Sequence, residues 1–268
     1  MMSRSDTHPG FDLRHRSIGL DRDKRVRIVL PTAPCAERKA PLCILLHGFG
    51  GNRLAWFAEG GDRVRRMARR CALVLPESGR RWFINDEAGF RYESYLVDEL
   101  VPELREILPD NVETGHIILG GFSMGGAAAV FLALRYPHLF PTAYSYGGAF
   151  FASRRTGDPY ATLRDDACMM PLQGEHDRVW GGRGSRTRRT YDPVSLVRES
   201  VAKQSLPAAI RLEVGREDYA RVLNHNRRMR RVLGAAGIDH SYEEVPGDHS
   251  WPAALRAMEQ GLECLIGS

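Results

Sequence analysis

The chain has 268 residues, of which 43% are hydrophobic and 26% are charged, and this composition suits one large α/β domain with a substantial core. Its formal net charge is +5, and almost all of the positive charge is arginine because only three residues are lysine. No apolar run of about 18 residues occurs, and residues 1–12 lack an apolar signal segment. We therefore expect neither a membrane span nor a secretory leader.

The five cysteines are odd in number and show no metal-binding spacing such as C-x-x-C. Cys43 and Cys71 lie beside apolar, strand-like runs. These features predict reduced and mostly buried thiols, and hence a cytoplasmic protein.

Apolar runs and helical patterns alternate along the chain after an N-terminal segment, residues 1–20, that we expect to be irregular. This alternation predicts an α/β fold with a mostly parallel central sheet flanked by helices. The expected strands are 26–30, 42–46, 72–75, 117–120, 142–145, 209–214 and 242–245. The expected helices are 54–70, 95–108, 124–135, 220–235 and 252–266, with a kink or break at Pro102.

Residues 147–207 fit this alternation poorly because they are rich in Gly, Arg, Asp and Pro. We expect a lid-like insertion beside the site, within one domain spanning residues 1–268. Arginines cluster at 183–189 and again on the expected helix 220–235. Because neither aromatic interleaving nor a nucleic-acid motif accompanies them, we interpret the clusters as a mobile loop and a solvated helix face and expect no nucleic-acid partner.

The stretch Gly121-Phe122-Ser123-Met124-Gly125 lies between an expected strand and an expected helix. In that context G-x-S-x-G forms a nucleophile elbow, a sharp turn that exposes the serine. The glycines leave room for the adjoining strand and helix, and the helix N-terminus favours negative charge. The motif alone also fits a glycine-rich turn with an incidental serine. The presence or absence of a histidine and a carboxylate at suitable positions distinguishes the two interpretations.

A serine hydroxyl becomes a nucleophile when a histidine accepts its proton and a carboxylate orients that histidine. In α/β-hydrolases the chain order is serine, acid, histidine. His249 lies in the turn directly after the last expected strand and is our candidate for the base. His225 and His240 lie on a helix and just before a strand, where we expect structural or solvent-facing roles.

Asp218 follows the expected strand 209–214 after a short turn, with one helix and one strand between it and His249. This position makes Asp218 our candidate for the acid of the triad. Asp248 is adjacent to the histidine in sequence and is expected to be a turn residue. The rival carboxylates, in order of preference, are Glu217, Asp177 and Asp192.

Attack on a carbonyl carbon leaves a negatively charged oxygen, the oxyanion. Stabilising it requires two preorganised backbone N–H donors. One is expected from the residue after the nucleophile, Met124. The other is expected from the glycine-rich loop after strand 42–46, at Phe49 or alternatively at Gly50. No G-K-[ST] follows this loop, which argues against a nucleotide-binding loop. We expect His47 to anchor the loop through a backbone hydrogen bond.

Several motifs resemble the "putative esterase" branch of the α/β-hydrolases, which includes S-formylglutathione hydrolase, the mycolyltransferases and, as the closest match, the small tributyrin-type carboxylesterases. They are Leu-Leu-His-Gly-Phe-Gly-Gly at 45–51, Tyr-Glu-Ser-Tyr-Leu at 92–96, Gly-Gly-Phe-Ser-Met-Gly-Gly at 120–126 and Gly-Asp-His-Ser-Trp at 247–251. The resemblance implies a triad of Ser123, Asp218 and His249, with Phe49 and Met124 at the oxyanion hole. It implies no metal and no organic cofactor.

These observations predict a serine carboxylesterase that hydrolyses small, short-acyl esters. An acyltransferase or a thioesterase would use the same triad, and a non-catalytic binding protein with the hydrolase fold is a remote alternative. The sequence leaves the natural substrate open, and it also leaves open whether the chain forms a homo-oligomer. The aromatic candidates for the substrate pocket are Trp82, Tyr92, Trp180 and Trp251.

Overall fold

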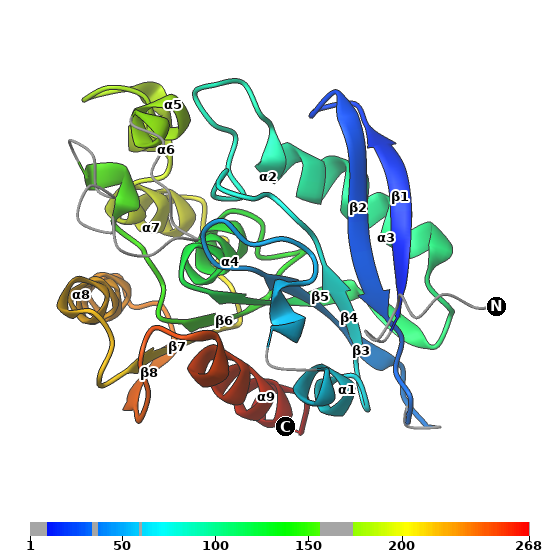
Figure 1. Cartoon of the computed structure of the whole chain (residues 1–268). Helices are drawn as coiled ribbons and strands as arrows, with labels where there is room; N and C mark the ends of the chain where they lie inside the picture. The colour runs from blue at the N-terminus through cyan, green and yellow to red at the C-terminus, as the bar shows by residue number, and fades with distance from the viewer. Residues whose placement is uncertain (1–9, 34–36, 59–60, 156–173, 268) are drawn as a thin grey trace.

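The computed structural model describes residues 10–33, 37–58, 61–155 and 174–267. Within these ranges, strands form one eight-stranded sheet in the order β1-β2-β4-β3-β5-β6-β7-β8 (Figure 1). Their bounds are β1 Phe11–Ser17, β2 Arg22–Val29, β3 Ala40–Leu46, β4 Ala72–Leu75, β5 Val112–Phe122, β6 Thr142–Tyr146, β7 Ala209–Gly215 and β8 His240–Val245.

The sheet is parallel from β4 through β8, and it is extended at one edge by the antiparallel strands β2 and β1. Strand β4 is buried along its whole length, and β3 is buried at six of its seven residues. Continuous apolar runs are typical of parallel strands that are covered on both faces. The predicted mostly parallel α/β sheet is thus confirmed.

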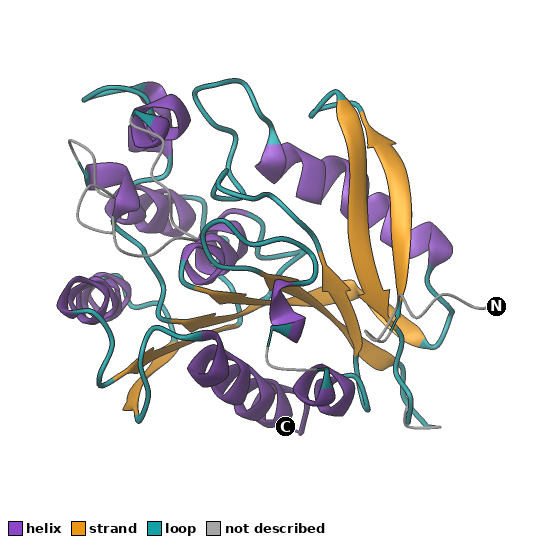
Figure 2. Cartoon of the chain, in the orientation of Figure 1, coloured by secondary structure: helices purple, strands orange, loops and turns teal. Residues whose placement is uncertain are grey.

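Helices flank both faces of this sheet (Figure 2). Helices α1 and α9 pack together on one face, whereas α4 lies on the other face against β3, β5 and β6 (Figure 1). The helix bounds are α1 Asp62–Met67, α2 Tyr92–Ser94, α3 Val101–Ile107, α4 Met124–Arg135, α5 Glu175–Trp180, α6 Arg186–Thr190, α7 Pro193–Ala202, α8 Ala220–Ala235 and α9 Trp251–Gly267.

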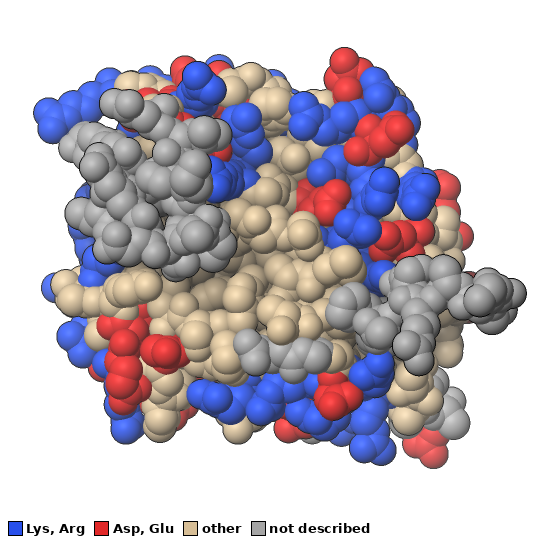
Figure 3. Space-filling model, in the orientation of Figure 1, with Lys and Arg blue, Asp and Glu red and all other residues tan. Residues whose placement is uncertain are grey.

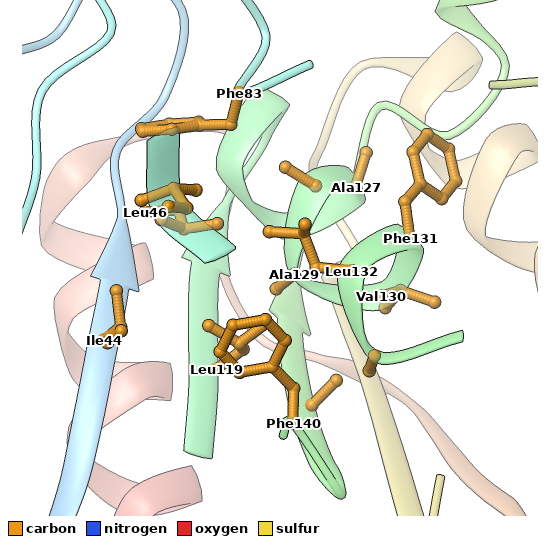
Figure 4. Packing of buried hydrophobic residues seen from close by; sticks show 14 of the residues in the cluster. Ile44, Leu46, Phe83, Leu119, Ala127, Ala129, Val130, Phe131, Leu132 and Phe140 are labelled. Atoms are coloured by element: carbon orange, nitrogen blue, oxygen red, sulfur yellow. The ribbon is translucent and has the colours of Figure 1, made fainter. Parts of the chain in front are cut away.

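The core consists of two apolar layers, one on each face of the sheet. Alternate residues of β3 divide between them, because Ile44 and Leu46 join the layer under α4 whereas Leu45 joins the layer under α9. Helix α4 is buried along almost its whole length, and its residues pack over β3 and β5 (Figure 4). This burial fixes the helix whose first turn follows Ser123.

The structure corrects three predicted elements. Residues 11–17 are not irregular: they form β1, which pairs with β2 from Phe11↔Ile28 to Ser17↔Arg22. Only three of its seven residues are exposed, but its mostly polar sequence gives no apolar pattern, so only the pairing reveals the strand. The expected helix 54–70 is instead a short 3-10 turn, Ala55–Phe57, followed by α1. At 95–108, a π-helical turn, Tyr95–Leu100, precedes α3, and Pro102 stands in the first turn of α3.

In the predicted insertion 147–207, residues 156–173 lie outside the described ranges. The rest includes α5, α6 and α7, so the described part of the arginine cluster at 183–189 is largely helical. Our interpretation of that cluster as a mobile loop is wrong for Arg188, which is 8% exposed. Its guanidinium donates hydrogen bonds to the carbonyl oxygens of Gly181 and Ser153, both at 2.8 Å.

Candidate active site

Ser123 lies on a strained turn between β5 and α4, with φ of 55° and ψ of −112°. A Cβ atom on Gly121 would lie 2.2 Å from the carbonyl oxygen of Gly125, and one on Gly125 would lie 2.0 Å from that of Leu46. Both approaches are far too close for any side chain. Glycine is therefore required on either side of the serine, as the elbow motif predicts.

Three side chains from three different elements form one chain of hydrogen-bonding contacts. His249 Nε2 lies 2.9 Å from Ser123 Oγ, and His249 Nδ1 lies 2.9 Å from Asp218 Oδ2. Asp218 follows β7, and His249 follows β8 and precedes α9. The Asp218 side chain is fully buried and its other oxygen accepts the backbone N–H of Tyr219 at 2.6 Å, so the carboxylate is held in place.

We did not identify from the sequence the residues that pack around the side chains of Ser123, His249 and Asp218. Gly147, with φ of +57°, passes so close that a Cβ there would lie 3.0 Å from Asp218 Oδ2 and 3.3 Å from His249 Nδ1. The rings of Phe122 and Tyr219 lie 4.8 Å and 5.4 Å from the His249 ring. The glycine pair directly after β6 was the one available signal for Gly147.

The rival acids are occupied elsewhere. Glu217 accepts the backbone N–H of Gly247 at 2.7 Å. Asp177 pairs with Arg188 at 2.8 Å, and Asp192 caps the N-terminus of α7. Asp248 bonds Ser250 in the turn. The structure thus brings Asp218 to His249, and it directs the other four carboxylates to different partners.

The other histidines near the expected positions also have separate surroundings. Burial, followed by the field of neighbouring arginines, lowers the pKa of His176 to about 4 and that of His225 to about 3. His240 Nδ1 lies 2.8 Å from the carbonyl oxygen of Ile238, consistent with a local structural role. None of these contacts reaches the serine.

The expected oxyanion donors lie on the loop after β3 and at the start of α4. Met124 is the first residue of α4, and Phe49 follows β3 by three residues. The alternative donor, Gly50, gives its N–H to the Gly79 carbonyl oxygen at 3.0 Å. The Gly50 N–H is therefore already engaged, and the donor role of Phe49 stays a prediction.

His47 holds the same loop. It is fully buried, its Nδ1–H donates to the Gly48 carbonyl oxygen at 2.7 Å, and its Nε2 accepts the Ser78 N–H at 3.0 Å. Burial lowers its pKa to about 4, so the ring is neutral at pH 7. This geometry agrees with the expected anchoring role.

Of the four aromatic residues predicted for the pocket, three are buried in the core. Trp82 is 4% exposed, Tyr92 is 4% exposed and Trp180 is 1% exposed. The rings of Trp82 and Trp180 pack edge to face at 5.3 Å. Trp251 is half-buried, and its ring packs 5.1 Å from that of Phe122, which in turn contacts His249. Direct substrate contact stays a prediction, and Trp251 is the best placed of the four.

Across the described ranges, no three or more His, Cys, Asp or Glu side chains are grouped so that they could hold a metal ion. In the same ranges, no helix has the length and apolar character needed to cross a membrane. Of the described cysteines, Cys43 and Cys71 are buried free thiols and Cys264 is an exposed free thiol.

A mostly parallel sheet, a serine on the turn between β5 and α4, and a histidine after the last strand define the α/β-hydrolase class. The chain matches the family described as "Putative esterase" over residues 17–262. It belongs to that family, and the resemblance predicted from its motifs is confirmed. The chain is an ester-hydrolysing enzyme built on the fold of the serine hydrolases.

Among its relatives, an acetyl esterase of Caldicellulosiruptor saccharolyticus is 27% identical over 210 residues, which are 77% of this chain and 76% of that protein. An esterase of Mycobacterium tuberculosis is 25% identical over 84% of this chain, which spans only about half, 52%, of that protein.

Solved structures share the fold at low identity. The fluorophosphonate-binding serine hydrolase F of Staphylococcus aureus has a TM-score of 0.79 at 17% identity, and the match covers 97% of this chain and 100% of that one. An S-formylglutathione hydrolase of the same species has a TM-score of 0.74 at 18% identity, covering 96% and 98% of the two chains.

Proposed function

We propose that this enzyme is a serine carboxylesterase that hydrolyses small, short-acyl esters through a covalent acyl-enzyme on Ser123. The observation that carries the proposal is the contact chain from Ser123 Oγ through His249 to the buried Asp218, with both distances at 2.9 Å. The 27% identical acetyl esterase supports a short acyl group.

In the first half-reaction, Ser123 Oγ attacks the ester carbonyl carbon while His249 Nε2 accepts the hydroxyl proton. The N–H groups of Met124 and Phe49 would stabilise the oxyanion that forms. The carbon–oxygen bond to the alcohol then breaks, and His249 returns its proton to the departing oxygen. Asp218 keeps Nδ1 protonated and stabilises the imidazolium, so Nε2 faces the serine as the base.

In the second half-reaction, His249 takes a proton from water as the water oxygen attacks the acyl carbon. The bond from that carbon to Ser123 Oγ breaks, His249 returns its proton to Ser123 Oγ, and the carboxylic acid leaves. Acyl transfer to another alcohol or hydrolysis of a thioester would use the same steps with a different nucleophile or leaving group. The absence of nucleic-acid and membrane partners, and the cytoplasmic location, stay predictions.

The test is the Ser123→Ala variant assayed with p-nitrophenyl acetate. We expect kcat to fall on the order of 10⁴–10⁶-fold, because the nucleophile is removed while the fold stays intact. Ser195→Ala is the matched control, since Ser195 is an exposed serine of α7, and we expect it to keep full activity. Intact-protein mass spectrometry should detect the acyl adduct on the wild type and on Ser195→Ala. Undiminished turnover by a folded Ser123→Ala protein would refute the proposal.

A further inference from the structure

Beside Asp218 and His249, α8 presents two arginines that form no ion pair within the described residues. Arg221, His225 and Arg228 lie at four- and three-residue spacing, so they share one face of α8. The Arg228 guanidinium lies 4.2 Å from the centre of the Phe151 ring, and the His225 ring packs against the same phenylalanine at 5.6 Å. We call Arg221 and Arg228 the α8 arginine pair.

Lysine and arginine side chains surround much of the face shown in Figure 3, so positive charge alone does not mark a site. The α8 arginine pair combines a place near His249 with the lack of an ion pair among the described residues, a lack that Arg230 and Arg231 of the same helix share. Arg227, on the same helix, forms an ion pair with Glu244, and nearby Arg154 forms one with Asp192. Across the described ranges, neither Arg221 nor Arg228 forms an ion pair.

Their surroundings are positive as well. His225 lies between the two arginines, and burial together with the charges of Arg155, Arg221 and Arg228 lowers its pKa to about 3. Burial and the nearby Arg154 likewise lower the pKa of Arg228, and the Asp192 carboxylate opposes this only in part. Each of these cationic groups makes it harder for its neighbours to hold a proton. A bound anion would offset this repulsion between like charges.

One aromatic ring connects this surface to the proposed chemistry. The Tyr219 ring lies 5.4 Å from the His249 ring, and the Arg221 guanidinium lies 5.7 Å from the centre of the same Tyr219 ring. His249 must return a proton to the leaving oxygen, so the alcohol portion of the ester has to lie beside His249. A substituent on that alcohol could pass Tyr219 and reach Arg221.

The guanidinium groups also keep N–H donors available for an anion. When a guanidinium stacks on a ring it uses its flat face, and its N–H edge remains available for the oxygens of an anion. The guanidinium carbon of Arg221 lies 5.7 Å from the centre of the Tyr219 ring, and that of Arg228 lies 4.2 Å from the centre of the Phe151 ring. Carboxylate and phosphate groups match this donor edge because each offers two acceptor oxygens.

We propose that the enzyme prefers esters whose alcohol portion carries an anionic group, a carboxylate or a phosphate, and that Arg221 and Arg228 bind that group. The inference rests on the proposed serine esterase mechanism. It makes the α8 arginine pair a determinant of specificity for the leaving group, with no part in the bond-making steps.

The test compares esters that differ in the charge of the alcohol portion. Methyl 4-acetoxybenzoate is neutral, 4-acetoxybenzoate carries a carboxylate, and 4-acetoxyphenyl phosphate carries a phosphate. We expect the double variant Arg221→Gln, Arg228→Gln to lower kcat/KM about tenfold for the charged esters and less than about twofold for the neutral ester. The charged ester whose kcat/KM falls more in the double variant carries the anion that fits the arginine pair better. Added salt should weaken wild-type selectivity, since the contacts are exposed.

Arg230→Gln is the matched control, because it removes the same charge from α8 at a residue that stacks on Tyr242 at 5.2 Å. The inference is overturned if Arg230→Gln lowers kcat/KM for the charged esters as much as the double variant does. It is also overturned if the double variant lowers kcat/KM equally for charged and neutral esters. A third contrary outcome is a loss only for monomethyl glutarate, whose carboxylate lies on the acyl side. Ser123→Ala assayed in parallel on the neutral ester separates the two ideas. Activity that survives in Ser123→Ala refutes the esterase mechanism, whereas a serine-dependent activity indifferent to the arginines refutes only this inference.

Discussion

Backbone hydrogen bonds from neighbouring strands hold the turn that carries Ser123. The Ser123 N–H donates to the Tyr146 carbonyl oxygen at 2.9 Å, which ties the elbow to the end of β6. The Ser123 carbonyl oxygen accepts the N–H of Ala149 at 3.0 Å, beyond the same strand. The turn between them contains Gly147, whose N–H bonds the Glu213 carbonyl oxygen at 2.8 Å. A strained serine backbone is thus supported from β6 and β7.

Gly147→Ala should therefore impair catalysis although it replaces no proposed catalytic residue. Alanine is strained at φ of +57°, and its Cβ would press on Asp218 Oδ2 and His249 Nδ1 from 3.0 Å and 3.3 Å. We expect kcat/KM for p-nitrophenyl acetate to fall about 10–100-fold and the free energy of unfolding to fall by ~1–2 kcal/mol. Gly182→Ala is the control, since no atom lies within 4 Å of its added Cβ. Equal activity in the two variants would contradict this account.

At the scale of elements, α5 and α6 are fastened to the body of the enzyme rather than free. Arg80 pairs with Glu175 at 3.0 Å, and the Thr187 hydroxyl donates to Glu87 at 2.6 Å. Arg188 adds hydrogen bonds to Gly181, Ser153 and Asp177, and so joins α6 to α5 and to the chain beyond β6. This docking is built from polar contacts between residues far apart in the chain, with buried Arg188 making several of them, and an amphipathic pattern does not reveal such contacts.

Arg188→Ala should loosen this docking, because it leaves buried carbonyl oxygens without a donor. We expect a loss of ~2–4 kcal/mol in the free energy of unfolding, with faster amide hydrogen exchange across residues 174–192. Arg183→Ala removes an exposed arginine from the same cluster and should cost less than ~0.5 kcal/mol. If urea denaturation gives the two variants the same stability, Arg188 does not hold these helices in place.

The elements that could be predicted from the sequence are those whose signals are local. The residues of α4 and α8 begin and end as predicted, and β4 also matches at both ends, because apolar periodicity, glycines and prolines mark these boundaries. The order of Ser123, Asp218 and His249 likewise follows from strand ends. The approach of Gly147 depends on Asp218 and His249, which lie far along the chain, so no local pattern predicts it. Strand β1 pairs with its neighbour β2, and its mostly polar sequence shows no apolar alternation that would predict a strand.

At the scale of the whole molecule, three distant regions each contain a histidine held neutral by its surroundings. His47 follows β3, His176 lies in α5 and His225 lies in α8. Burial is the main cause in each case, and nearby Lys or Arg charges lower the pKa further, to about 4, about 4 and about 3 respectively. The folded protein therefore resists protonation at several places at once.

This property predicts that acid destabilises the enzyme. As pH falls below about 6.5, the ordinary histidine pKa, the unfolded chain binds protons that the folded state excludes. The contribution of each histidine is present above pH 6.5 and is lost as pH falls toward its folded pKa. We expect the free energy of unfolding, measured with urea, to drop on the order of 2 kcal/mol per histidine between pH 7 and pH 5.

His225→Phe isolates one of these contributions. His225 already packs edge to face against Phe151, and its buried Nδ1 has no hydrogen-bond partner among the residues that the structure describes, so a phenyl ring can replace it at little cost at pH 7. The variant should lose less stability than the wild type between pH 7 and pH 5, by about the contribution of a single histidine. Parallel stability curves for the two proteins over this range would show that His225 binds its proton equally well in the folded and unfolded chains.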